Sequence, residues 1–414
     1  MSANFYLSSH ANNHLHPRAA LVAARQEDYK HATEQELAFL EIWSASAMQK
    51  ICKRLNLRQQ VLSTAIVFFR RFYLRNSYCE TEPSLVAASC VYVAAKAEET
   101  PVHVKSAVSE AKAVFNEMGM TAFTSDNNRL AEMEFYLIEE LDFHLIVFHP
   151  YRALMQLCGK DGGVQSGGED GRESRRKMLE MEDASFQMAW FIINDTFRSS
   201  LCLVHPPHLL ALAAIYLSLS MHPPRSLISA FTSLNNATSA GSSSSTTTGD
   251  TAPSGVASRT RRRGSIETVA SNSTKASNST SQLTSHHPNN GKPHGQADPL
   301  TFLAKVEIDQ SLLLEIIQEI ISLYELWSLL EGPSSTAQAP LSPQTQIPNP
   351  SNPSGRGTRL EGNNMDQKMV GLIKRMQDSR LRELRDERTR ASQIGSSGTH
   401  GVGTPGGSVG GKRG

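Results

Sequence analysis

Two charged residues, Lys96 and Glu134, stand within apolar helical patterns and could form an ion pair at the edge of a core. Glu134 lies on one stripe with Leu130 and Leu137, at helical spacing. Lys96 ends the run CVYVAAK and extends the line of Tyr92. A carboxylate among leucines is costly unless it is paired, so the lysine is its expected partner. The alternative is a surface lysine and a glutamate at the rim of the core.

Two glutamates, Glu98 and Glu99, follow Lys96 at the end of the same predicted helix. Lysine suits the negative end of a helix dipole, whereas each glutamate opposes it by about 0.3–1 kcal/mol. The two carboxylates are therefore not placed to stabilise their own helix. This position favours a role for the two carboxylates in contacting another protein surface.

The sequence offers no constellation of residues typical of an enzyme. It has no P-loop, no dinucleotide fingerprint, no HExxH and no GxSxG. His205 and His208 flank two prolines, but no further ligands accompany them, so we expect neither a metal nor a cofactor. The five cysteines lack a CxxC spacing, and several stand in apolar helical runs, which is typical of reduced core cysteines in an intracellular protein. We therefore expect a binding or regulatory protein.

Five segments of helical patterning between about residues 33 and 148 would position the charged pair. The first opens with Thr33 and Glu36, which form a capping box in sequence. The third opens with Pro83, which suits a first helical turn, and it stops before Pro101. We find no strand ladder, so the predicted fold is all-α.

The helical pattern recurs after Pro150. Residues 84–96 pair with residues 208–220 at an offset of 124, and residues 130–143 pair with residues 314–327 at an offset of 184. The growth of 60 is what an insertion between these segments would add. This indicates a tandem duplication of a five-helix unit. The second copy has Ser220 and Gln318 where the first has Lys96 and Glu134, so the fold itself does not require the ion pair.

Low-complexity segments divide the chain further. The second unit contains a stretch rich in Ser, Thr, Asn and Gly, and the region after it is rich in Pro, Ser and Gln before ending in Gly. Such compositions bury too little surface to offset the entropy of ordering, so we expect disorder there. The predicted parts are an N-terminal helix or arm at 1–30, a first unit at 31–148, a second unit at 149–331 with a disordered insertion at about 222–298, and a disordered tail at 332–414 with a short helix at about 365–390.

Charge and apolar runs limit the other partners. The net charge is +1, so the whole chain is not a polyanion binder. The N-terminal residues lack an apolar leader, and the run Leu209–Met221 is shorter than the roughly 20 residues that span a bilayer. The basic run Arg259–Glu267 would serve nuclear import, phosphorylation at Ser265, or neither. The tail helix, with Met369 and Met376 on one face, would dock on a partner or on nucleic acid, or form only transiently.

The sequence AAKAEE, followed by LAEMEFYLIEELDF, resembles the cyclin box. In that family an alanine-rich helix ends in a Lys-x-Glu-Glu-like motif, and a glutamate two helices later completes a kinase-contacting pair. Segments at residues 4–10, 55–75, 190–207 and 305–327 extend the resemblance over nearly all of residues 4–330 except the insertions. Within the cyclin family, the sequence resembles the cyclins of the Mediator kinase module.

The resemblance implies two five-helix cyclin boxes that bind and activate a cyclin-dependent kinase and regulate transcription by RNA polymerase II in the nucleus. It assigns kinase binding to Lys96 and Glu134 at the centre, with Tyr92, Glu98 and Glu99 beside them and Phe5 and Tyr6 in an N-terminal helix. It also implies contacts with other Mediator kinase-module subunits, but no direct contact with nucleic acid or membrane. The sequence departs from the cyclin pattern in two places. Thr100-Pro101 follows the Lys-x-Glu-Glu-like motif, and the Met-Arg-Ala-Ile-Leu motif that docks substrates in cell-cycle cyclins is lacking.

Two other functions fit the same tandem fold. A general transcription factor that binds promoter DNA would carry a zinc ribbon before the repeats and a basic face, and the sequence has neither a ribbon nor a strongly basic total. An adaptor that binds other partners without a kinase would use the same groove.

Overall fold

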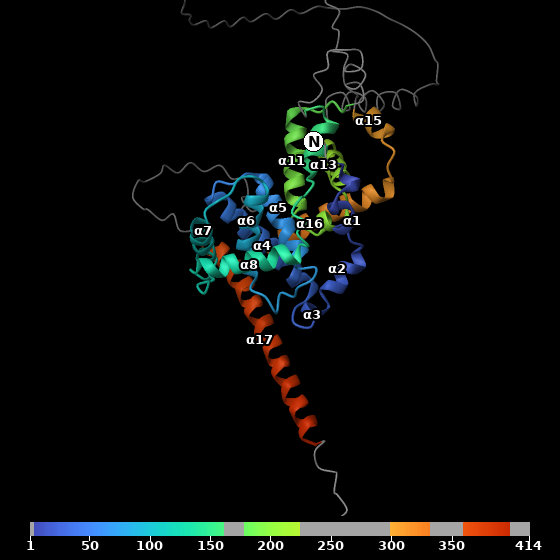
Figure 1. Cartoon of the computed structure of the whole chain (residues 1–414). Helices are drawn as coiled ribbons and strands as arrows, with labels where there is room; N and C mark the ends of the chain where they lie inside the picture. The colour runs from blue at the N-terminus through green and yellow to red at the C-terminus, as the bar shows by residue number, and fades with distance from the viewer. Residues whose placement is uncertain (1–3, 161–177, 224–298, 332–358, 398–414) are drawn as a thin grey trace, which may run out of the picture. The chain divides into compact units, whose positions relative to one another are not determined.

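The computed structural model describes residues 4–160, 178–223, 299–331 and 359–397, and the regular elements in these ranges are helices (Figure 1). The all-α prediction is confirmed for this part of the chain. Nearly all of the predicted insertion, most of the predicted tail and Ser265 lie outside the described residues. The predicted tail helix lies inside them.

The first repeat consists of five helices. The first of these begins with the predicted capping box: Thr33 N donates to Glu36 Oε2 over 3.0 Å, and Glu36 N donates to Thr33 Oγ1 over 3.2 Å. Pro83 occupies the first turn of the third helix. The helices are α4 (Glu34–Arg54), α5 (Gln59–Phe72), α6 (Pro83–Ala97), α7 (Val104–Glu117) and α8 (Asn127–Glu140).

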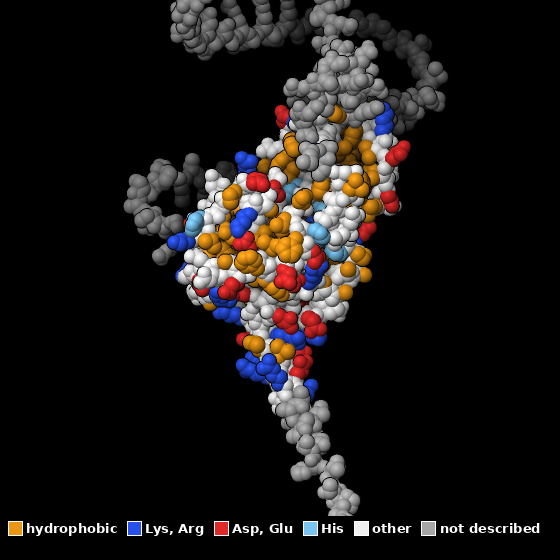
Figure 2. Space-filling model, in the orientation of Figure 1, with side chains coloured by type: hydrophobic (Ala, Val, Ile, Leu, Met, Phe, Trp, Pro, Cys, Tyr) orange, Lys and Arg blue, Asp and Glu red, His pale blue; other side chains and the backbone are white. Residues whose placement is uncertain are grey.

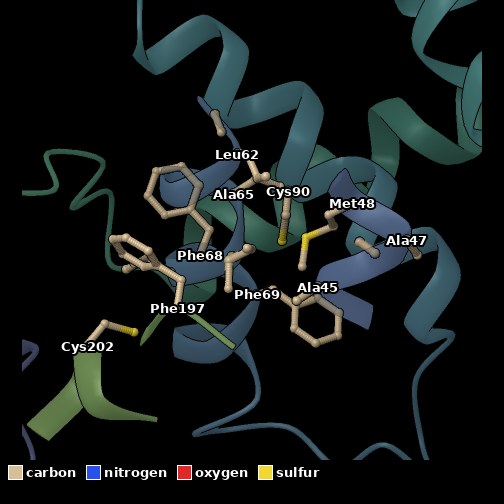
Figure 3. Close-up of a cluster of buried hydrophobic side chains, with 14 of the residues drawn as sticks. Ala45, Ala47, Met48, Leu62, Ala65, Phe68, Phe69, Cys90, Phe197 and Cys202 are labelled. Carbon is tan, nitrogen blue, oxygen red and sulfur yellow. The ribbon is translucent and has the colours of Figure 1, made fainter. Parts of the chain in front are cut away.

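Helix α6 is the centre of the first repeat, where it packs against α4, α5, α7 and α8. Its buried residues are mostly small, such as Ala87, Ala94 and Ala95, which lets the neighbouring helices approach closely. Figure 3 shows Met48 and Cys90 in one buried cluster with phenylalanines of α5, and Phe197 at its edge. Phe197 belongs to the second repeat, so the two repeats share one hydrophobic core.

The second repeat is built around α13 (Pro207–Met221), which packs against α9, α11, α12 and α16. Helices α6 and α13 are both 15 residues long and both begin at proline, at the predicted offset of 124. The described helices of this repeat are α9 (Pro150–Leu157), α11 (Asp183–Thr196), α12 (Leu201–Val204), α13, α15 (Pro299–Lys305) and α16 (Gln310–Glu331).

The segment before the first repeat forms an arm that contacts both repeats. It consists of the 3-10 helix η1 (Phe5–Leu7) and the helices α1 (Ser9–Asn13), α2 (Arg18–Ala24) and α3 (Gln26–Tyr29). His16 N donates to Leu203 O in the second repeat over 2.7 Å, and Arg25 donates to Asn76 O in the first repeat over 3.3 Å. The arm therefore bridges the two repeats through hydrogen bonds to each of them.

The tail contributes one long helix, α17 (Arg359–Ser397), which is longer than the predicted segment at 365–390. It packs against α4 of the first repeat (Figure 1). Met369 and Met376, which the sequence places on one face, are both buried there. The sequence therefore indicated the helix and its apolar face, and the structure adds that this face lies on the protein's own first repeat.

Candidate functional site

The structure brings together Lys96, in the last turn of α6, and Glu134, in the middle of α8. Lys96 Nζ donates to Glu134 Oε1 over 2.6 Å, and the same ammonium lies 4.4 Å from the centre of the Tyr92 ring. The Glu134 side chain is 14% exposed, whereas that of Lys96 is 43% exposed. The carboxylate of the pair is therefore largely buried, and the ammonium is accessible to solvent.

The Lys96–Glu134 pair contributes little to the folding stability of the protein. An ion pair with one exposed partner contributes little to folding, at most about 1 kcal/mol. Desolvation lowers the pKa of Lys96, but the hydrogen bonds to Glu134 and Tyr92 outweigh it and raise that pKa above its ordinary value. Lys96 therefore stays charged at neutral pH. An ammonium has three donors, so at least one donor remains beyond those engaged by Glu134 and Tyr92.

The equivalent place in the second repeat carries no such pair. Ser220 donates to Tyr216 O within its own helix over 2.9 Å, and Gln318 is exposed. Two similar helical units thus differ at the two positions where the first carries charge. The fold of the second repeat therefore forms without an ion pair at these positions.

Glu98 points into the protein, toward α5 and the start of the second repeat. Its carboxylate accepts hydrogen bonds from Gln60 over 2.6 Å and from Thr64 over 2.5 Å, and it lies 3.7 Å from His149 Nε2. Burial raises the pKa of Glu98, but the nearby His149 and the hydrogen bond from Thr64 outweigh burial and leave that pKa below its usual value. Glu98 therefore fastens the end of α6 to its neighbours.

Glu99 points outward and turns the chain. Its φ of 54° lies in the left-handed region, where a residue other than glycine is uncommon. The turn is closed by hydrogen bonds from Glu99 N to Lys96 O over 3.2 Å and from Thr100 N to Ala95 O over 2.9 Å. The exposed carboxylate thus stands one turn from Lys96, on the same end of α6.

In the arm, Phe5 and Tyr6 have different surroundings. The Phe5 ring lies 5.5 Å from that of Phe148 and 6.4 Å from that of His208, so it anchors η1 between the repeats. Tyr6 is 67% exposed, and the next residue, Leu7, is exposed as well. With η1 anchored through Phe5, the side chains of Tyr6 and Leu7 face solvent.

Three further residues of the site were not predicted. Phe135 is 75% exposed beside Glu134, and Phe143 and Ile146 are 74% and 70% exposed in the segment after α8. Figure 2 shows hydrophobic side chains gathered over the face that carries α8, with charged side chains among them. Exposed apolar residues in such number mark protein–protein contacts. The sequence signal was that Phe135 falls off the Leu130–Leu137 stripe.

Within the residues that the structure describes, no group of three His, Cys, Asp or Glu side chains could hold a metal ion. No described helix is long and apolar enough to cross a bilayer. His205 and His208 do not come together with further ligands.

Comparison with known proteins gives the family of the chain. Residues 5–146 match the family model described as the N-terminal domain of cyclins. The chain is 36% identical to the RNA polymerase II holoenzyme cyclin-like subunit of Mycosarcoma maydis, over 79% of this chain and 90% of that protein. It is 37% identical to cyclin-C of Rattus norvegicus, over 53% of this chain and 72% of that protein.

Among solved structures, the chain is similar to a chain of the yeast TFIIK (Kin28/Ccl1/Tfb3) complex, with 23% identity and a TM-score of 0.38 over 53% of this chain and 91% of that chain. The two relatives in sequence are above 30% identical and are covered over more than two thirds of their lengths. The chain therefore belongs to the cyclin family, among the cyclins of the cyclin C type.

Proposed function

We propose that the chain is the regulatory subunit that binds and activates a cyclin-dependent kinase of the Mediator kinase module. As a cyclin, it performs no chemistry of its own. The observation that carries the proposal is the Lys96–Glu134 pair. Its lysine is exposed, its glutamate precedes the exposed Phe135, and the second repeat has no equivalent pair.

The proposed mechanism is a shift of the kinase's conformational population. In this proposal Lys96 and Glu134 hydrogen-bond main-chain groups near the kinase's regulatory helix, while Phe135, Tyr92 and the arm residue Tyr6 supply apolar contact. Binding then favours the state in which the glutamate of that helix pairs with the lysine of the ATP site. Glu99 lies beside this contact, and Glu98 and Phe5 position it from within the protein.

The finer assignment to Mediator, and with it a nuclear location, rests on relatives. One relative is named as a subunit of the RNA polymerase II holoenzyme and the other as cyclin-C. Mediator kinase-module subunits are accordingly the proposed further partners. The surface around Lys96 and Glu134 is the one proposed for the kinase, and the proposal of further partners rests only on these relatives.

The experiment is a measurement of kinase affinity with charge-reversed variants. Lys96→Glu and Glu134→Arg should each weaken binding of the purified kinase by at least about tenfold, which corresponds to about 1.4 kcal/mol. Ser220→Glu and Gln318→Arg place the same charges at the equivalent positions of the second repeat and should leave the affinity unchanged. If the first two variants bind as the wild type does, the assigned surface is wrong.

A further inference from the structure

Helix α17 buries an apolar face on the first repeat. Met369, Leu372, Ile373 and Met376, at helical spacing, are each at most 5% exposed. At the start of this face, Trp43 Nε1 donates to Asp366 Oδ1 over 2.8 Å, a contact between residues 323 positions apart. The docked part of α17 is thus fixed in register on α4.

The same helix also contacts two other segments of the protein. Toward the end of the arm, His31 Nδ1 lies 2.9 Å from Ser379 Oγ. Toward the connection between α5 and α6, Gln377 donates to Thr81 O over 2.8 Å and Arg380 donates to Glu80 over 2.9 Å. One face of α17 therefore joins the arm, α4 and the segment that leads into α6.

These two segments are already tied to each other beneath α17. The buried carboxylate of Asp28 in α3 accepts from Ser77 Oγ over 2.6 Å and from Tyr78 N over 2.9 Å, and it pairs with Arg25 over 2.8 Å. Arg25 in turn lies over the Tyr78 ring, 4.9 Å from its centre. Helix α17 thus contacts two segments that are already joined to each other by hydrogen bonds and an ion pair.

Both segments lead to the proposed kinase-binding residues. Thr81 stands two residues before Pro83, the first residue of α6, and the other end of α6 carries Lys96. His31 stands at the end of the arm that begins with Phe5 and Tyr6. A helix is stiff along its axis, so fixing the start of α6 restricts the orientation of its far end.

The charges of α17 and of the surface on which it packs are complementary. The first repeat and the arm present Glu36, Glu80 and Glu27, and α17 meets them with Arg375 and Arg380. Arg380 also pairs with Glu383 within its own helix. Most helical stability in proteins comes from packing of an apolar face, so these contacts stabilise the docked part of α17.

We propose that α17 is an intramolecular strap that fixes the arm and the start of α6, and thereby strengthens kinase binding at the distant Lys96–Glu134 pair. The inference rests on the function proposed above. Its occupant is the chain's own segment 365–380, seated on α4, His31 and the Glu80–Thr81 connection. Kinase affinity and strap docking are coupled, so each favours the other.

The test uses the full chain with Met376→Asp, which places a charge in the apolar contact. We expect faster amide hydrogen exchange at residues 26–32 and 77–82, and kinase affinity about tenfold lower, equivalent to about 1.4 kcal/mol. Arg388→Glu changes an exposed residue of the same helix beyond the docked part and should change neither quantity.

A second pair of variants guards against misfolding. Arg380→Glu alone should undock the strap, because it opposes Glu80 and Glu27, and Glu80→Arg should partly restore both exchange protection and kinase affinity when combined with it. The strap is overturned if Met376→Asp or Arg380→Glu accelerates exchange at residues 26–32 and 77–82 yet leaves kinase affinity unchanged. It is also overturned if neither variant accelerates that exchange.

These outcomes are distinct from failure of the proposed function. If the wild-type chain does not bind the kinase, or if Lys96→Glu binds normally, the function itself is wrong. If Lys96→Glu weakens binding while the undocked variants bind normally, only the strap is wrong.

Discussion

At the end of α6, three charged side chains that are close in sequence have three different environments. Lys96 reaches across to Glu134, Glu98 turns inward to Thr64, and Glu99 stays in solvent. The left-handed backbone at Glu99 separates the directions of the two glutamates. In the Lys-x-Glu-Glu run, Lys96 therefore forms an exposed ion pair, Glu98 makes structural hydrogen bonds, and Glu99 is free of both roles and faces solvent, so of these three only Lys96 is proposed as a central kinase contact.

Replacing Glu98 should lower stability. Glu98→Gln keeps the size but weakens charge-assisted hydrogen bonds from Thr64 and Gln60, so we expect a loss of about 1–3 kcal/mol in the free energy of unfolding. Chemical denaturation measures it. The matched variant Glu99→Gln should stay within about 0.5 kcal/mol of the wild type, and equal effects of the two variants would refute the structural role of Glu98.

The effect of Glu98 should depend on pH. Its pKa is lower in the folded protein than in the unfolded chain, so its stabilisation is complete above the unfolded value of about 4.3. It is lost as the pH falls through the folded pKa. The stability difference between wild type and Glu98→Gln should therefore be constant from pH 5 to 7 and shrink below about pH 4.

At the scale of elements, histidines line the contact between the arm and the body. His10 Nδ1 accepts from Phe148 N over 3.0 Å, and His14 Nε2 lies 3.2 Å from His144 Nδ1. Burial, followed by the charge of Arg71, lowers the pKa of both His10 and His14 to about 3. Both are therefore neutral in the folded protein at neutral pH.

Acidification should therefore loosen the arm. Unfolded histidine titrates near 6.5, so between about pH 6.5 and 3 the unfolded chain binds more protons and the folded state loses stability. At pH 5 this amounts to about 2 kcal/mol for each residue. Neighbouring His149, His144 and His16 act in the same direction, and Asp142 opposes the shift at His14.

The measurement is the unfolding free energy at pH 7 and pH 5. His14→Gln should reduce the difference between the two values, although it also lowers stability at pH 7. His222→Gln, at an exposed position, should keep the full difference. A wild-type protein that is equally stable at both pH values would contradict this account of the arm.

The elements differ in how far sequence predicts them. Proline at the start of α6 and α13, the capping box of α4 and the repeat offset are local signals, and each has its counterpart in the structure. The docking of α17 depends on Trp43 meeting Asp366, and the inward turn of Glu98 depends on Thr64 and His149. No local pattern encodes such contacts, because they exist only after the helices have packed.

At the scale of the whole molecule, Arg198 joins the two repeats. It donates to Ser46 over 2.7 Å and to Gln49 over 2.8 Å in α4, and its guanidinium lies 4.1 Å from the centre of the Trp327 ring in α16. The shared core and this arginine indicate that the described part of the two repeats unfolds as one unit.

Arg198→Met should destabilise that unit. The variant keeps apolar volume but loses two charge-assisted hydrogen bonds across the repeats, so we expect a loss of about 1.5–3 kcal/mol. Equilibrium denaturation followed by tryptophan fluorescence measures it. Arg152→Met, at an exposed position on α9, should have little effect, and an unchanged midpoint for Arg198→Met would contradict the bridging role.

The central claim is that this cyclin activates a kinase through its first repeat, and the most direct test is the rate of phosphate transfer by the purified kinase as the cyclin is titrated. We predict that the wild type raises the rate to a plateau and that Lys96→Glu needs at least about tenfold more protein to reach it. Ser220→Glu should follow the wild-type curve. Identical curves for Lys96→Glu and the wild type, or no activation by either, would contradict the account.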